Sequence, residues 1–181
     1  MSASRPSAAA PSTPRFSRAE REVHRAVAVL MFTCMATAAV LYNGSLALLV
    51  GHRHLVELVH VWSGLALPVP MLLGAASAAY RADVLRLERL TRDDWRWLRS
   101  RRRRDGSIPV DRFNAGQKLN AALVVGSVLV LLGTGVLMGW TGLVRLSWRS
   151  GATFVHDWFA LGLGLLVAGH VWFAMRYGTG D

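Results

Sequence analysis

Four long apolar stretches run along the chain, and more polar segments separate them. They cover about residues 24–42, 55–80, 117–140 and 153–177, and charged side chains are few within them. As helices rising about 1.5 Å per residue, each is long enough to cross a hydrocarbon layer of about 30 Å. A backbone surrounded by lipid must satisfy its own hydrogen bonds, so these stretches must be helical. The pattern predicts an all-α membrane protein, a bundle of four transmembrane helices.

Two positions should interrupt these helices. Asn43-Gly44 favours a break after the first span, beyond which apolar residues continue to Val50. Pro68 and Pro70 fall inside the second span, where proline lacks a helical backbone donor and clashes with the preceding turn. We therefore expect a kink in the second helix.

Residues 1–20 differ from the rest of the chain because they are rich in Ala, Pro, Ser and Arg. Such a segment cannot bury a core, and the first apolar stretch begins too late for a secretory signal. We expect residues 1–20 to be a disordered cytoplasmic tail and residues 21–181 to form one four-helix membrane domain.

Charge is concentrated between the spans. Hydrophobic residues make up 52% of the chain and charged residues 18%, with a formal net charge of +10. A soluble domain spreads its charges over its surface, whereas here basic residues flank apolar spans, where they set membrane topology. This placement argues against the nucleic-acid binding that a basic chain otherwise suggests.

Lysine and arginine are divided unequally between the two sides of the membrane. Eighteen of the 21 lie near the N-terminus, between the second and third spans, or at the end of the last span, and three lie on the other side: Arg53, Arg145 and Arg149. The richer side should be cytoplasmic. We expect a multi-pass protein of the bacterial cytoplasmic (inner) membrane, with both termini and the basic loop over residues 81–116 inside. Within that loop, the run over residues 99–104 favours contact with anionic lipid over a specific protein contact.

The chain contains six histidines, and ionisable side chains within a membrane are costly and usually functional. His52 and His54 belong to the short outer loop, where a solvated histidine costs little, and we assign them no role. The other four lie within or at the ends of the apolar spans: His24, His60, His156 and His170.

These four histidines match in depth as two pairs. His156 and His170 share the fourth span and are 14 residues apart, which places them on one helix face and about 21 Å apart along its axis. His60, at the outer end of the second span, lies at the depth of His156. His24, at the inner end of the first span, lies at the depth of His170.

Two histidine pairs at different depths predict two b haems stacked across the membrane. Neutral imidazole is a good ligand for haem iron, and two imidazoles leave no open position. His60 with His156 would hold the outer iron, and His24 with His170 the inner one. Cys34 is the sole cysteine and no Cys-x-x-Cys-His motif occurs, so the haems would be held without covalent bonds. The alternative is a non-redox scaffold whose histidines merely pack.

Small residues interrupt the spans at six places. A porphyrin needs helices whose backbone can be approached closely, but close helix–helix packing through small residues explains glycines equally well. The sequence leaves both explanations open for Gly64, Gly133, Gly135, Gly162, Gly164 and Gly169.

Four stretches of the chain show a family resemblance that covers about residues 15–178. They are Arg-Glu-Val-His at 21–24, Leu-Val-His-Val-Trp-Ser-Gly at 58–64, Phe-Asn-Ala-Gly-Gln-Lys at 113–118, and the His156 to His170 spacing continued by Val-Trp-Phe-Ala-Met. In these stretches the chain resembles the γ subunit, or cytochrome b subunit, of respiratory formate dehydrogenase. The third stretch is the most specific.

The resemblance implies the same haem ligand pairs and a quinone site on the cytoplasmic side. In that family the outer haem receives electrons from an iron–sulfur subunit, and the inner haem passes them to menaquinone. The quinone-site motif falls on Asn114, Gly116 and Gln117, near His170. Simple capping of the third span is the alternative for Asn114 and Gly116.

The resemblance also implies partners. The chain would anchor the iron–sulfur and molybdopterin catalytic subunits of an extracytoplasmic formate-dehydrogenase-like complex, and it would carry their electrons to menaquinone. We expect no formate oxidation by this chain itself, because it has one cysteine and no domain of the size that holds molybdopterin. The alternative is the same type of cytochrome b serving another donor, either a different molybdoenzyme or a hydrogenase.

Overall fold

The computed structural model describes residues 16–101, 105–139, 142 and 144–177. These residues are helical apart from short connections, as the sequence predicts. The helices are α1 (Arg18–Tyr42), α2 (Gly44–Val50), α3 (Arg53–Ala66), α4 (Pro68–Gly74), α5 (Ala78–Glu88), α6 (Arg92–Arg99), α7 (Ala115–Gly139) and α8 (Leu146–Tyr177).

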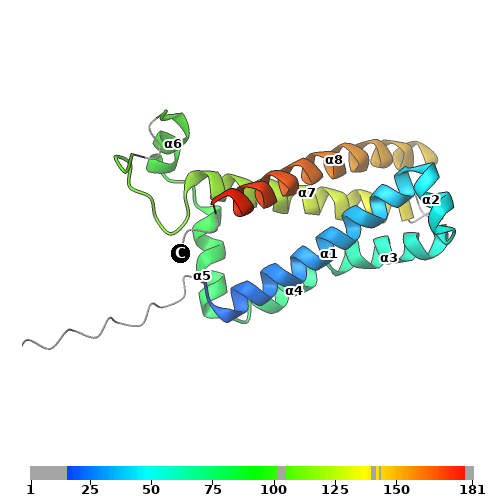
Figure 1. The fold of residues 1–181 in the computed structure, drawn as a ribbon, viewed down its shortest axis with the longest axis horizontal. Helices are drawn as coiled ribbons and strands as arrows, with labels where there is room; N and C mark the ends of the chain where they lie inside the picture. Colours follow the sequence, from blue (N-terminus) through cyan, green and yellow to red (C-terminus); the bar gives the residue numbers. More distant parts are fainter. Residues whose placement is uncertain (1–15, 102–104, 140–141, 143, 178–181) are drawn as a thin grey trace, which may run out of the picture.

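Four segments of the described chain are long and apolar enough to span a membrane: α1, α3 together with α4, α7 and α8. They lie along one direction as an elongated bundle, and α5 and α6 lie outside one end of it (Figure 1). The predicted fold class is therefore confirmed.

Helix α1 begins at Arg18, six residues before the predicted start of the first span. Ser17 and Glu20 form a reciprocal capping box, in which each side chain accepts a hydrogen bond from the other's backbone N–H. This polar cap extends the helix beyond the apolar stretch. Of the predicted disordered tail, residues 1–15 lie outside the described residues, and Arg18 to Glu20 are helical.

The expected break after the first span occurs at Asn43. Its backbone is extended, and its side chain accepts hydrogen bonds from the N–H groups of Ser45 and Leu46, which starts α2. Gly51 then ends α2 with φ of 70°, a left-handed conformation that glycine adopts without a steric penalty.

The second span is interrupted where the prolines predict, because α3 ends at Ala66 and α4 begins at Pro68. It ends at Gly74, earlier than the predicted Tyr80, since the Ser77 side chain caps a new helix, α5. Figure 1 shows α5 turned across the end of the bundle. A Cβ atom at Gly74 would lie 2.6 Å from Val23 Cγ2, so the close approach of α4 to α1 requires glycine.

Helix α7 starts two residues before the predicted third span, and Trp140, its predicted end, lies outside the described residues. Helix α8 starts at Leu146, seven residues before the predicted fourth span. The hydroxyls of Ser150 and Thr153 donate to backbone carbonyls one turn earlier. Helix α8 therefore begins in the polar segment that precedes the apolar stretch.

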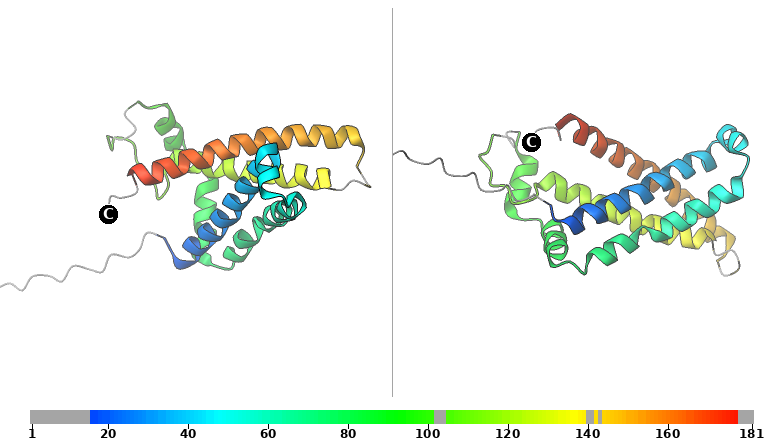
Figure 2. Two further views of the ribbon diagram at one scale, coloured as in Figure 1. Left: turned by 45° about the vertical axis from the view of Figure 1, so that its right-hand side comes forward. Right: turned by 60° about the horizontal axis from the view of Figure 1, so that its bottom comes forward.

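The bundle consists of two packed units, α1 with α3 and α4, and α7 with α8. Figure 2 shows the two units crossing. Their shared core is a small cluster of buried residues in the middle of the bundle, formed by Met31, Leu67 and Leu163. Leu163 is seven residues from both His156 and His170, so this core lies between the two predicted haem levels.

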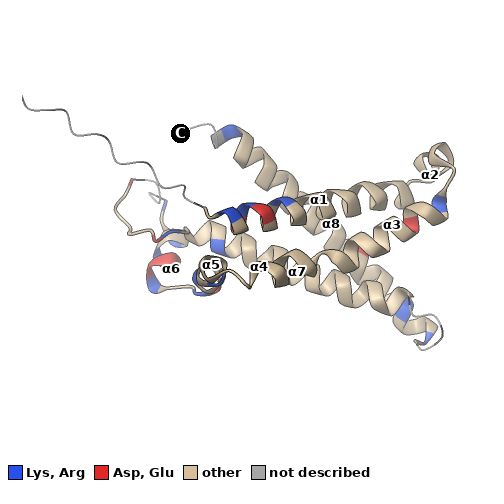
Figure 3. Cartoon of the chain, turned by 90° about the horizontal axis from the view of Figure 1, so that it is seen from below, with Lys and Arg blue, Asp and Glu red and all other residues tan. Residues whose placement is uncertain are grey.

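Charged residues gather at the end of the bundle that carries α5 and α6 (Figure 3). Helix α6 is fixed to α7 there by two contacts. Lys118 Nζ lies 2.7 Å from Asp94 Oδ2, and both residues are buried. The Trp97 indole lies 3.5 Å from where a Cβ atom of Gly116 would be. These contacts determine which face of α6 turns away from the bundle, and that face forms an open groove lined by Arg92, Trp95, Arg96 and Arg99.

The Asp94–Lys118 pair should hold α6 in place at neutral pH. Burial opposes ionisation of Asp94, but the hydrogen bonds from Lys118 and Thr91 outweigh it and hold its pKa below the ordinary value. A lowered pKa stabilises the folded state above the ordinary aspartate value of about 3.9. That contribution is lost only as the pH falls through the lowered pKa.

We predict that Asp94→Ala releases α6, because it leaves the buried Lys118 ammonium without its partner at a cost of about 3–5 kcal/mol. Trypsin should then cleave the segment around Arg99 faster in detergent-solubilised protein. Asp93→Ala is the matched control, since it removes only the exposed Asp93–Arg96 pair, worth about 0–1 kcal/mol. Equal cleavage of both variants would contradict the prediction.

Candidate functional site

The four membrane histidines form two close pairs, and these are the pairs that depth matching predicts. The ring centres of His24 and His170 are 6.1 Å apart, with 64° between the ring planes. Those of His60 and His156 are 6.4 Å apart, with 67° between the planes. The first pair joins α1 to α8, and the second joins α3 to α8, so both pairs link the two helical units.

Both distances fit a single metal ion between two imidazoles. A metal–imidazole bond is about 2 Å long and the nitrogen lies about 1.1 Å from the ring centre, so two opposed imidazoles on one ion have centres about 6.2 Å apart. A direct N–H···N bond of about 2.9 Å would bring the centres to about 5 Å. The observed spacing therefore suits coordination better than mutual hydrogen bonding.

The number of protein ligands also fits haem. No group of three or more His, Cys, Asp or Glu side chains occurs in the described part of the chain in an arrangement that could bind a metal. A histidine pair alone does not complete the coordination of a zinc site. It does complete that of haem iron, because the porphyrin supplies the remaining nitrogens.

The outer pair has well-defined hydrogen-bond partners. His60 Nδ1 lies 2.9 Å from Thr37 Oγ1 and 3.2 Å from the Cys34 carbonyl oxygen. His156 Nδ1 lies 2.9 Å from Thr134 Oγ1. In both rings Nδ1 is engaged, which leaves Nε2 as the nitrogen able to bind iron.

The inner pair differs in its surroundings. His24 and His170 are exposed in this chain, whereas His60 and His156 are half-buried. Within the described residues, neither inner ring makes a hydrogen bond that resembles the threonine contacts of the outer pair. The two histidine pairs thus have similar ring-centre distances, but the rings of the outer pair alone are held by threonine hydroxyls among the described residues.

Most of the six glycines are not explained by close helix packing within the chain. A Cβ atom added at Gly64, Gly133, Gly162 or Gly169 would meet nothing within 4 Å. At Gly135 it would lie 3.6 Å from His156 Cε1, an ordinary van der Waals distance. Close packing within this chain therefore does not account for the first four glycines, and a haem environment stays a prediction for them.

The profile of the prokaryotic cytochrome b561 family matches residues 15–181, nearly the whole chain. The chain belongs to the prokaryotic cytochrome b561 family. It is therefore a four-helix membrane cytochrome b of a family that binds two haems, and it serves as an electron-transfer subunit that anchors a redox complex. No curated protein matches the chain.

In this cytochrome b561, the predicted quinone residues cap α7. The Asn114 N–H donates to Gln117 Oε1, and the Gln117 N–H donates to Asn114 Oδ1, both at 2.9 Å. Gly116 lies beneath this cap, against Trp97. The side-chain oxygens of Asn114 and Gln117 therefore cap α7, as the alternative explanation from the sequence proposes. Each amide still has an NH₂ group with two donors, and no partner for either group occurs among the described residues.

A cluster of ion pairs that the sequence does not reveal lies at the same end of the chain as α5. Arg112 Nη2 is 2.7 Å from Asp83 Oδ2 and 3.4 Å from Glu20 Oε1, and Arg86 Nη1 is 2.7 Å from Asp83 Oδ1. Burial, followed by the hydrogen bond with Glu20, raises the pKa of Asp83 above its ordinary value. The cluster ties the start of α1 and α5 to the segment before α7.

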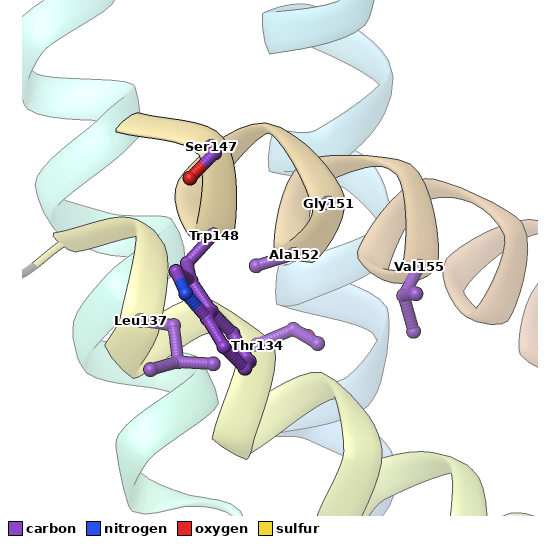
Figure 4. Close-up of a pocket in the computed structure, with 7 residues that line it drawn as sticks. All are labelled: Thr134, Leu137, Ser147, Trp148, Gly151, Ala152 and Val155. Carbon is purple, nitrogen blue, oxygen red and sulfur yellow. The ribbon is translucent and has the colours of Figure 1, made fainter. Parts of the chain in front are cut away.

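Beside the outer histidine pair, the end of α7 and the start of α8 enclose a shallow hollow of about 520 Å³. Figure 4 shows Trp148 along one wall, near Leu137, with Thr134 on the α7 side. Thr134 therefore contacts both this hollow and His156.

Sequence reasoning missed Thr37 and Thr134. Polar side chains within an apolar span are the usual signal of function, and both meet that criterion. Thr33 and Thr153 meet it as well, yet each bonds only to the preceding turn of its own helix. The sequence alone could not separate these two kinds of threonine.

Proposed function

We propose that this chain is the dihaem cytochrome b anchor of a formate-dehydrogenase-type complex, and that it carries electrons from the outer side of the membrane to menaquinone on the cytoplasmic side. The observation that carries the proposal is the two histidine pairs, each with a ring-centre distance that suits one iron. Their levels differ by about 21 Å along α8.

The residues that hold the haems are assigned by pair. His60 and His156 would hold the outer haem iron, with Nε2 as the nitrogen left available, and His24 and His170 would hold the inner one. A b haem between two imidazoles supplies reversible one-electron chemistry and has no open position for oxygen. The protein contributes the spacing of the rings, their orientation and the apolar core between the two levels.

The orientation of the chain follows from its charges. The end of the bundle with α5 and α6 holds most of the lysines and arginines (Figure 3), and such ends face the cytoplasm. The start of α7 and the end of α8 lie at this same end (Figure 1). This arrangement supports a cytoplasmic position for Asn114, Gly116 and Gln117, and for His170.

We place the menaquinone head group at the start of α7. The capping box holds Asn114 and Gln117 in fixed positions, and their NH₂ groups can donate hydrogen bonds to quinone carbonyls. Gly116 lets Trp97 and the Asn114 side chain pack closely at the start of α7. Capping and quinone binding are compatible because they use different atoms of the same amides.

The proposal also names the enzyme complex that donates the electrons. The stretches over residues 21–24, 58–64 and 113–118 favour a formate-dehydrogenase-type iron–sulfur and molybdopterin complex. A different molybdoenzyme or a hydrogenase would use the same cytochrome architecture. Purification of the native complex through a tag on this chain distinguishes the three donors. A catalytic subunit with molybdopterin and formate activity indicates a formate dehydrogenase, one with molybdopterin but no formate activity indicates another molybdoenzyme, and one with nickel indicates a hydrogenase.

We predict that the purified protein contains two low-spin b haems, and that loss of one histidine removes one of them. His60→Ala and His156→Ala should deplete the same haem, and His24→Ala and His170→Ala the other, as measured by the pyridine haemochrome assay and redox titration.

His52→Ala and His54→Ala are the controls and should retain two haems per chain. Depletion of the same haem by His60→Ala and His170→Ala would overturn the pairing.

Membrane topology gives a second prediction. In a Cys34→Ala background, a cysteine at exposed Ser150 should react with an impermeant thiol reagent in intact cells. A cysteine at exposed Ser107 should react only after permeabilisation, because that segment is cytoplasmic. The reverse pattern would place the quinone site on the wrong side of the membrane.

The quinone site is tested with variants that separate capping from binding. Asn114→Ser keeps a good capping oxygen but lacks the NH₂ group, and Gln117→Glu likewise keeps the capping box. Both should load two haems that the donor reduces, while menaquinone-analogue reduction falls about fivefold or more, as expected for about 1–3 kcal/mol of lost hydrogen bonding. Normal quinone reduction by both variants would leave these residues with capping alone.

A further inference from the structure

The outer histidines are held by two threonines in the same way. Thr37 on α1 contacts His60 on α3, and Thr134 on α7 contacts His156 on α8, each with 2.9 Å between Oγ1 and Nδ1. The threonine precedes its histidine by 23 residues in one unit and by 22 in the other. The two helical units thus repeat one contact, and the residues around the two histidines also match, reading Val-His-x-Trp at 59–62 and at 155–158.

We propose that Thr37 and Thr134 are positioning residues for the outer haem, which fix the proton, the rotation and the donor strength of its two axial imidazoles. The proposal rests on the assignment of His60 and His156 as ligands.

The direction of the hydrogen bond at His60 follows from its neighbours. The Thr37 hydroxyl has one proton, and it lies 2.7 Å from the Thr33 carbonyl oxygen and 3.0 Å from that of Cys34. A carbonyl can only accept, so this proton is used within α1 and the hydroxyl accepts from His60. The Cys34 carbonyl, 3.2 Å from His60 Nδ1, also accepts. The proton of the neutral ring is therefore on Nδ1, and Nε2 has the free lone pair.

The same reasoning holds at His156. The Thr134 hydroxyl lies 2.7 Å from the Val130 carbonyl oxygen and 3.2 Å from that of Leu131. It donates within α7 and accepts from His156 Nδ1. Both outer imidazoles are thus set in the tautomer that binds iron through Nε2.

The contact also affects the electronic character of the ligand. When a metal-bound histidine donates its other N–H to an acceptor, its orientation is fixed and its basicity rises. A more basic imidazole stabilises oxidised iron relative to reduced iron. The threonines should therefore hold the midpoint potential of the outer haem lower than it would be without them.

The inner pair provides the internal comparison. In the part of the chain that the structure describes, no threonine contacts the ring of His24 or His170, and both rings are exposed. Loss of Thr37 or Thr134 should consequently affect one haem and leave the other unchanged.

The experiment is a redox titration and low-temperature EPR of Thr37→Val and Thr134→Val in the full-length dihaem protein. We expect the outer haem, identified as the one lost in His60→Ala, to shift to higher potential and change its low-spin EPR signal. A tenfold change in the preference for oxidised iron corresponds to about 59 mV for a one-electron couple. The inner haem should keep its potential, and Thr37→Ser should restore the wild-type values.

Thr33→Val is the matched control, because Thr33 also donates to the preceding turn of α1 but contacts no histidine. Unchanged outer potential and EPR signal in both threonine variants would overturn the positioning role while the two haems remain in place. A shift of both haems, or an equal shift in Thr33→Val, would also overturn it, since either shows a general change in α1. A wild-type protein with no b haem would instead refute the proposed function.

Discussion

The structure depends on the need of every polar group inside the membrane to find a partner within the protein. Among the described residues, the two helical units share a small apolar core in which Met31, Leu67 and Leu163 are buried and further hydrophobic side chains pack against them. Lipid competes with such apolar contacts, so packing alone joins membrane helices weakly. The histidine pairs lie on either side of this core and connect α8 to α1 and α3. Haems bound between these rings would join the two units, so cofactor binding and assembly of the bundle would be coupled.

The same need explains the smaller features around the spans. Asn43 satisfies the first backbone donors of α2, which allows the chain to turn at the outer end of α1. Ser17 does the same for α1. Lys118, near the start of α7, is paired with Asp94 from a helix that lies outside the bundle. The proposed haem and quinone sites use groups for which this pairing is incomplete, namely histidine ring nitrogens and the NH₂ groups of Asn114 and Gln117.

Much of the fold could be predicted from the sequence, because apolar length and proline position have direct physical meaning. The four spans, the break at Asn43 and the interruption before Pro68 follow from them. Helix ends were less predictable: the Ser77 side chain caps α5 inside the predicted second span, and α8 begins at Leu146, before the apolar pattern of the fourth span. The histidine pairs could be predicted from depth alone. Thr37 and Thr134 could not, because their role depends on which face of a neighbouring helix they meet.

The contrast between the two histidine pairs suits transport across a membrane potential. An electron that moves inward works against a field that is negative inside, at a cost of about 2.3 kcal/mol per 100 mV for full crossing. If the threonines lower the outer potential as proposed, the outer haem would be the stronger reductant and would supply part of this energy. Among the described residues the inner rings have no such threonine acceptor, so on the same reasoning the inner haem would have the higher potential of the two. The proton uptake that accompanies quinone reduction would then occur on the cytoplasmic side, where the capping box of α7 holds Asn114 and Gln117.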